Sequence, residues 1–182
     1  LEALEQFFAN SPADTGIAFV IVQHLDPHYK GTMCELLQRI TPMPVQQITD
    51  KTLVKANNIY IIAPGFDLSI VNDVLHLLKP TEPHGQGLPI DFFLKSLAVD
   101  KKEHSIGLIL SGMGSDGTLG LRAIKDNAGA TFVQSPSSAK FDSMPSSAIN
   151  AKVADVVAPA EDLIREIISL RLEITFKLKV EV

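Results

Sequence analysis

A stretch in the second half of the chain constrains the fold most, because it carries the pattern of strand, glycine-rich turn, helix and strand. Ile106–Leu110 is a continuous apolar run, typical of strands that are buried on both faces of a parallel sheet. Ser111–Gly117 contains three glycines and leads into a helical segment at Thr118–Asn127, and Thr131–Gln134 predicts the next strand. We therefore expect two parallel strands joined by a right-handed helical crossover.

The same alternation of strands and helices runs through most of the chain. Further strands are predicted at Ile17–Val22, Val45–Ile48, Ile59–Ile62 and Val153–Val157. Further helices are predicted at Leu1–Asn10, Thr32–Ile40, Asp91–Val99, Pro145–Ala151 and Glu161–Leu172. Asp91 is expected to be the N-cap or a first-turn acid of its helix. This order predicts a doubly wound α/β domain, a Rossmann-like three-layer sandwich with a mostly parallel sheet.

Two segments depart from the alternation. Asp67–Lys79 contains Asn-Asp between two apolar runs, which predicts an antiparallel hairpin although the favoured glycine is missing. Pro80–Pro89 is rich in proline and glycine and predicts a surface loop. We expect one domain over residues 1–172, followed by a linker or C-terminal tail over residues 173–182. The imperfect alternation of that tail leaves a linker and an ordered strand as alternatives.

Composition excludes several classes of protein. The chain has 182 residues, 46% of them hydrophobic and 20% charged, which suits one globular domain. The net charge of −5 argues against a nucleic-acid partner. No apolar run approaches the roughly 18 residues that would predict insertion into a membrane. The single cysteine, Cys34, forms no internal disulfide and fits a reducing compartment.

His24 is the first candidate for chemistry. It comes directly after the predicted strand Ile17–Val22, and ligands of doubly wound folds bind at the carboxyl ends of strands. The other four histidines lie in loops, in the hairpin or before a strand. A loop histidine that only caps or packs remains the alternative for His24.

Asp116 is the second candidate, within the turn SGMGSDG. Gly112–Gly117 formally matches G-x-G-x-x-G, but Asp116 would lie beside a bound pyrophosphate and repel it. Nucleotide binding therefore stays an alternative, to be tested by titration with a dinucleotide. We favour an acid that orients a base, because a carboxylate such as Asp116 can hold His24 as in serine hydrolases. Such a site also needs a serine at a third strand end.

Several ordered motifs resemble the methylesterase domain of CheB, from about Leu1 to about Val157. The matching segments are Ile21–Pro27, Asn58–Gly65, Ser111–Gln134 and Met144–Asn150. Leu88–Ala98 resembles the version found in fused methylesterase–methyltransferase proteins.

The resemblance implies hydrolysis of glutamyl γ-methyl esters on the cytoplasmic helices of chemoreceptors, and in some members deamidation of glutamines. It implies a cytoplasmic protein without cofactor or metal, in which His24 and Asp116 are catalytic and the Met113 backbone lies at the oxyanion site. The partner would be a methylated chemoreceptor or a related signalling protein. A non-catalytic regulatory module with the same fold is the alternative.

The family's serine falls outside the 182 residues. The resemblance places it in a glycine-rich turn just before Leu1, and no serine of the chain replaces it by position. We therefore expect residues 1–182 alone to lack esterase turnover. The same upstream segment would include a central strand, so we expect an open slot in the core, unless residues 174–182 fill it.

Overall fold

The computed structural model of the chain describes residues 1–23, 32–80 and 87–180, and only the backbone of residues 172–180. Within these ranges the strands form two parallel sheets and one antiparallel sheet, each with three strands. The first parallel sheet has the order β1-β4-β2, with β1 at Phe19–Ile21, β4 at Ile59–Ile61 and β2 at Val45–Gln47. The second has the order β7-β8-β9, with β7 at Ile106–Ile109, β8 at Ala130–Gln134 and β9 at Val156–Ala158.

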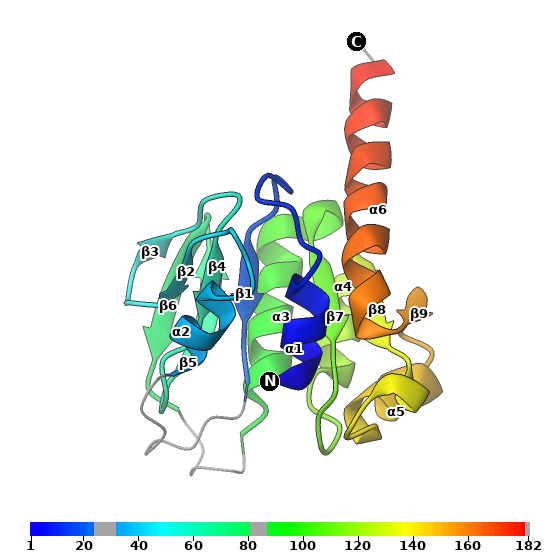
Figure 1. The fold of residues 1–182 in the computed structure, drawn as a ribbon, viewed down its shortest axis with the longest axis horizontal. Coiled ribbons are helices and arrows are strands. Elements are labelled where there is room, and N and C mark those ends of the chain that lie inside the picture. Colours follow the sequence, from blue (N-terminus) through cyan, green and yellow to red (C-terminus); the bar gives the residue numbers. More distant parts are fainter. Residues whose placement is uncertain (24–31, 81–86, 181–182) are drawn as a thin grey trace.

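Helices cover both faces of the parallel strands (Figure 1). The near face carries α1 at Glu2–Phe8, α2 at Met33–Gln38 and α6 at Ala160–Val180. The other face carries α3 at Pro89–Lys101, α4 at Thr118–Asp126 and α5 at Ser143–Asn150, whose buried residues belong to a separate core. The predicted three-layer α/β architecture is thus confirmed.

Alternate residues of the strands supply two separate cores. Ile59 and Ile61 of β4 pack with Phe7 and Phe8 on the side of α1 and α6. Tyr60, between them, packs on the other side with residues of α3 and of the antiparallel sheet. Because successive side chains of a strand point to opposite faces, one apolar run supports both layers.

The antiparallel sheet has the order β3-β6-β5, with β3 at Thr52–Leu53, β6 at Val74–Leu78 and β5 at Asp67–Val71. The predicted hairpin is confirmed as β5 and β6. Its turn residues Asn72 and Asp73 have φ values of 50° and 65°, the positive values that a tight hairpin turn of type I′ needs. The backbone N–H of Asn72 donates to Asp100 of α3 at 2.5 Å, which helps to hold this turn without glycine.

One strand was missed, and one prediction needs correction. The sequence pattern missed β3, because a strand of two residues is too short to show a period. The tail is helical as far as Val180, so the strand alternative for residues 174–180 is wrong. The last turns of α6 project away from the other elements in Figure 1. The division of the chain after residue 172 stays a prediction.

Candidate active site

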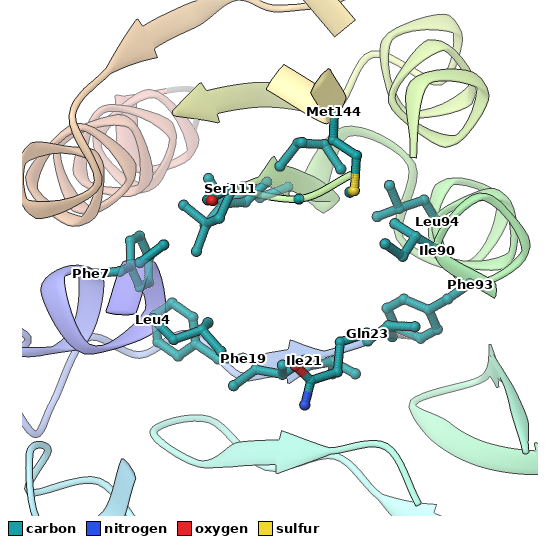
Figure 2. A pocket seen from close by; sticks show the side chains of 18 of the residues that line it. Leu4, Phe7, Phe19, Ile21, Gln23, Ile90, Phe93, Leu94, Ser111 and Met144 are labelled. Carbon is teal, nitrogen blue, oxygen red and sulfur yellow. The ribbon is translucent and has the colours of Figure 1, made fainter. Parts of the chain in front are cut away.

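A cavity of about 580 Å³ separates β1 from β7. Residues 17–23 line it along β1, and residues 106 and 108–113 line it along β7 and the turn that follows, so the ends of both strands reach it. Figure 2 shows Phe7 of α1 and Phe93 of α3 on opposite sides of this space. Most of the lining is apolar, and the polar side chains in it belong to Gln23 and Ser111.

The turn after β7 is held by hydrogen bonds from two neighbouring segments. The Ser111 N–H donates to the Gln134 side chain at 2.8 Å, and the Ser111 hydroxyl accepts from the Phe141 N–H at 3.0 Å. The Gly112 N–H donates to the Phe141 carbonyl at 2.9 Å, and the Met144 N–H donates to the Gly112 carbonyl at 3.1 Å. These bonds give the turn a fixed position at the mouth of the cavity.

Glycine is required at two points where the turn enters α4. Gly114 and Gly117 have φ values of 85° and 94°, which side chains disfavour. A Cβ atom on Gly117 would also lie 2.3 Å from Cδ1 of Ile109. The glycines therefore let the chain reverse direction tightly while Asp116, between them, is turned into the protein.

Asp116 is buried, with 4% of its surface exposed, and its carboxylate lies at the first turn of α3. One carboxylate oxygen accepts the backbone N–H of Asp91 at 2.8 Å, and the other accepts that of Ile90 at 3.0 Å. The first N–H groups of a helix have no partner within the helix, and its N-terminus carries a partial positive charge. Both features hold the Asp116 carboxylate in one orientation.

Met113 lies three residues earlier in the same turn and differs from Asp116 in exposure. Met113 has 72% of its surface exposed, and it lines the cavity. Among the residues that the structure describes, the Met113 backbone N–H donates no hydrogen bond. A free N–H at a cavity mouth can bind an oxygen atom of a ligand.

His24 lies outside the described residues, so its distance to Asp116 stays a prediction. The residue before it, Gln23, lines the cavity at the end of β1. The chain thus brings the end of β1 and the turn at Ser111–Gly117 to one cavity, as the strand-end argument predicts. Asp116 and Met113 lie together in that turn.

The comparisons with known proteins agree with this arrangement. The protein family described as CheB methylesterase matches residues 1–167 of the chain. The chain belongs to the CheB methylesterase family. The family resemblance seen in the sequence motifs is therefore confirmed, and the closer resemblance of Leu88–Ala98 to fused proteins stays a prediction.

Individual relatives support the family at similar levels of identity. A putative protein-glutamate methylesterase/protein-glutamine glutaminase of Leptospira interrogans is 30% identical over 164 residues, which are 90% of this chain and 85% of the relative. A protein-glutamate methylesterase/protein-glutamine glutaminase of Trichodesmium erythraeum is 29% identical over 171 residues, and the chain spans 49% of its length. The crystal structure of the Thermotoga maritima CheB methylesterase catalytic domain has a TM-score of 0.83 and 28% identity, covering 93% of this chain and 92% of that one.

Two further carboxyl groups lie near Asp116 in this CheB methylesterase domain, and sequence reasoning gave neither a role at the site. Burial raises the pKa of Asp91, and the charge of Asp116 adds to this increase. The backbone N–H groups of Gly120 and Gly117 oppose it without cancelling it. Burial likewise raises the pKa of Asp67, again with a contribution from Asp116. The described residues contain no group of three or more His, Cys, Asp or Glu side chains that could hold a metal ion.

Of the two alternatives for Asp91, the first-turn acid is confirmed, because Leu88 occupies the N-cap position of α3. The Asp91 carboxylate accepts the Gly120 N–H of α4 at 2.6 Å. A first-turn aspartate marks a capping residue in the sequence, but nothing in the sequence indicates which helix it caps.

Proposed function

We propose that this domain hydrolyses γ-methyl esters of glutamyl residues on chemoreceptor helices by a Ser-His-Asp mechanism. His24 is the general base, Asp116 orients it, and the Met113 N–H binds the oxyanion. The nucleophilic serine is expected in the segment that the resemblance places before Leu1. The observation that carries the proposal is the buried Asp116 carboxylate, held at two oxygens in the turn that borders the cavity.

The reaction follows from these roles in two halves. The serine oxygen attacks the ester carbonyl while His24 takes the hydroxyl proton, and the negative oxygen of the intermediate faces the Met113 N–H. The intermediate collapses, the ester C–O bond breaks, and His24 gives the proton to the departing methoxide, which leaves as methanol. Water then attacks the acyl-enzyme in the same way and releases the glutamate. One hydrogen-bond donor at the oxyanion lowers the activation free energy by roughly 3–4 kcal/mol.

Deamidation of receptor glutamines fits the same chemistry. The leaving group is then ammonia rather than methanol, and the acyl-enzyme is identical. The printed names of the Leptospira and Trichodesmium relatives include protein-glutamine glutaminase as well as methylesterase. We include this second activity in the proposal, and we place both reactions in the cytoplasm, where the receptor helices of the proposed substrate lie.

The serines near the site do not suit the nucleophile's role. The Ser111 hydroxyl accepts the Phe141 N–H and supports the turn. Ser115 is exposed beside the buried Asp116. Loss of a triad nucleophile lowers the rate about a millionfold. We therefore expect residues 1–182, expressed alone, to release methanol at a rate lower than the native polypeptide by about that factor.

The test is methanol release from a methylated chemoreceptor by the native polypeptide that contains residues 1–182. His24→Ala and Asp116→Asn should each lower kcat at least a hundredfold, on the order of the losses seen for triad partners. Asp126→Asn is the matched control, because Asp126 is exposed at the opposite end of α4 and should leave the rate unchanged. A folded native protein that releases no methanol, or whose preceding turn lacks serine, would support the non-catalytic regulatory module instead.

A further inference from the structure

Helices α3 and α4 begin side by side, and carboxylates at their N-terminal ends accept backbone N–H groups across the contact. Asp116, two residues before α4, accepts the N–H groups of Ile90 and Asp91 at the start of α3. Asp91, in the first turn of α3, accepts the Gly120 N–H in the first turn of α4 at 2.6 Å. The exchange links both ends of the segment that carries Asp116.

The two helices meet at their backbones where this exchange occurs. A Cβ atom on Gly120 would lie 2.5 Å from Cβ of Leu94 and 3.2 Å from Cα of Asp91. At this separation there is no room for water between the first turns. Asp91 itself has 3% of its surface exposed, so its carboxylate depends on the Gly120 N–H for a hydrogen bond.

We propose that Asp91 is a positioning residue for hydrolysis, which holds the segment 117–120 against α3 and so keeps the Asp116 carboxylate aimed. This inference rests on the proposed function, because it assigns Asp91 no role apart from Asp116. Asp91 acts through the Gly120 backbone N–H, four residues after Asp116, and not on a reacting atom.

The energetics support a function beyond stability. Burial and the neighbouring Asp116 charge both raise the pKa of Asp91, so placing a second carboxylate here is unfavourable. An apolar residue would avoid that cost, but it would leave the Gly120 N–H without an acceptor. Because a carboxylate misplaced by about 1 Å can cost a hundredfold in rate, a firm hold on Asp116 has catalytic value.

The test compares Asp91→Ala, Asp91→Asn and Asp116→Asn, singly and combined, in the native polypeptide. Asp91→Ala removes the acceptor for Gly120 and should lower kcat roughly 10- to 100-fold with KM unchanged within twofold. Asp91→Asn keeps an acceptor oxygen and should recover most of the rate. Asp91→Ser, whose hydroxyl is too short to reach Gly120, replaces Asp91→Ala if the alanine variant does not fold.

A double-mutant cycle separates positioning from stability. If Asp91 acts through Asp116, Asp91→Ala should lower kcat by less than twofold when Asp116 is already asparagine. A purely structural role reduces the folded fraction and would lower kcat equally in both backgrounds, which would overturn the inference. If Asp116→Asn lowers kcat but Asp91→Ala keeps kcat within twofold of wild type, the inference about Asp91 is overturned while the proposed function stands. If Asp116→Asn itself stays within twofold, the proposed function fails and the inference with it.

Discussion

The Thr131 hydroxyl lies 2.9 Å from the Asp155 carboxylate, and the Thr131 backbone N–H donates to the same carboxylate oxygen, also at 2.9 Å. In return, the Asp155 N–H donates to the Thr131 hydroxyl at 3.0 Å. The Lys125 ammonium of α4 pairs with the other Asp155 oxygen. This contact joins β8, α4 and the residue before β9, so it stabilises the second parallel sheet far from the site.

Asp155→Asn should lower stability in a way that depends on pH. Partial burial alone would raise the pKa of Asp155, but hydrogen bonds from Lys125 and Thr131 outweigh it and hold the pKa below its ordinary value. The ionised Asp155 carboxylate therefore stabilises the fold above about pH 4, and this stabilisation is lost as the pH falls through the folded-state pKa. We expect a loss of about 1 kcal/mol at pH 7, because solvent screens this partly exposed pair.

Urea unfolding at pH 7 and pH 3 measures this effect. The difference between wild type and Asp155→Asn should shrink at the lower pH, and the exposed Asp126→Asn should show no such change. If the two proteins differ in free energy of unfolding by the same amount at both pH values, the ionised Asp155 carboxylate is not the source of the stability.

Thr131→Val should destabilise the domain at every pH. Thr131 is fully buried, and its hydroxyl also donates to the Val153 carbonyl at 2.6 Å. Valine leaves the Val153 carbonyl without this donor, at a cost of about 1–3 kcal/mol, while the Asp155 N–H keeps the Thr131 backbone carbonyl as its acceptor. Thermal unfolding checks the loss, and Thr49→Val at an exposed position is the control. A melting temperature equal to that of wild type would show that water replaces these bonds.

Gly120→Ala should destabilise the domain although alanine favours helices. The helical preference of alanine contributes about 1 kcal/mol. The added Cβ would lie 2.5 Å from Cβ of Leu94, so α3 and α4 must separate, and overpacking of this kind costs about 1–3 kcal/mol. The free energy of unfolding, measured in urea, should fall. Leu119→Ala, on the exposed side of the same helix, is the comparison, and an increase in stability for Gly120→Ala would contradict the close helix contact.

Cys34 should react slowly with thiol reagents. Burial raises the pKa of its thiol, and the charge of Glu35 adds to the increase, so less reactive thiolate is present at pH 7 than in a free cysteine. Alkylation should therefore be slower in the folded chain than in urea, and Glu35→Gln should speed the folded-state reaction. Equal rates in the folded and unfolded chain would rule out this environment.

The order of elements could be predicted because their signals are local. The apolar run of β7, the turn glycines and the helical spacing of α4 each lie within a few residues, and the hairpin of β5 and β6 needed only Asn-Asp between two apolar runs. Where the local signal was weak, prediction failed. Residues 174–180 alternate imperfectly, and they are helical rather than extended.

The sequence by itself determined the alternation of strands and helices and the tight turn that holds Met113 and Asp116, whereas the strand-end position of His24 stays a prediction. Only the tertiary structure decided that the Asp116 carboxylate faces the start of α3 and that Asp91 caps α4 rather than its own helix. The reason is geometric: a capping bond between two helices depends on how closely and at which height they pack. That packing is set here by Gly120 against Leu94, residues that no local pattern relates to each other.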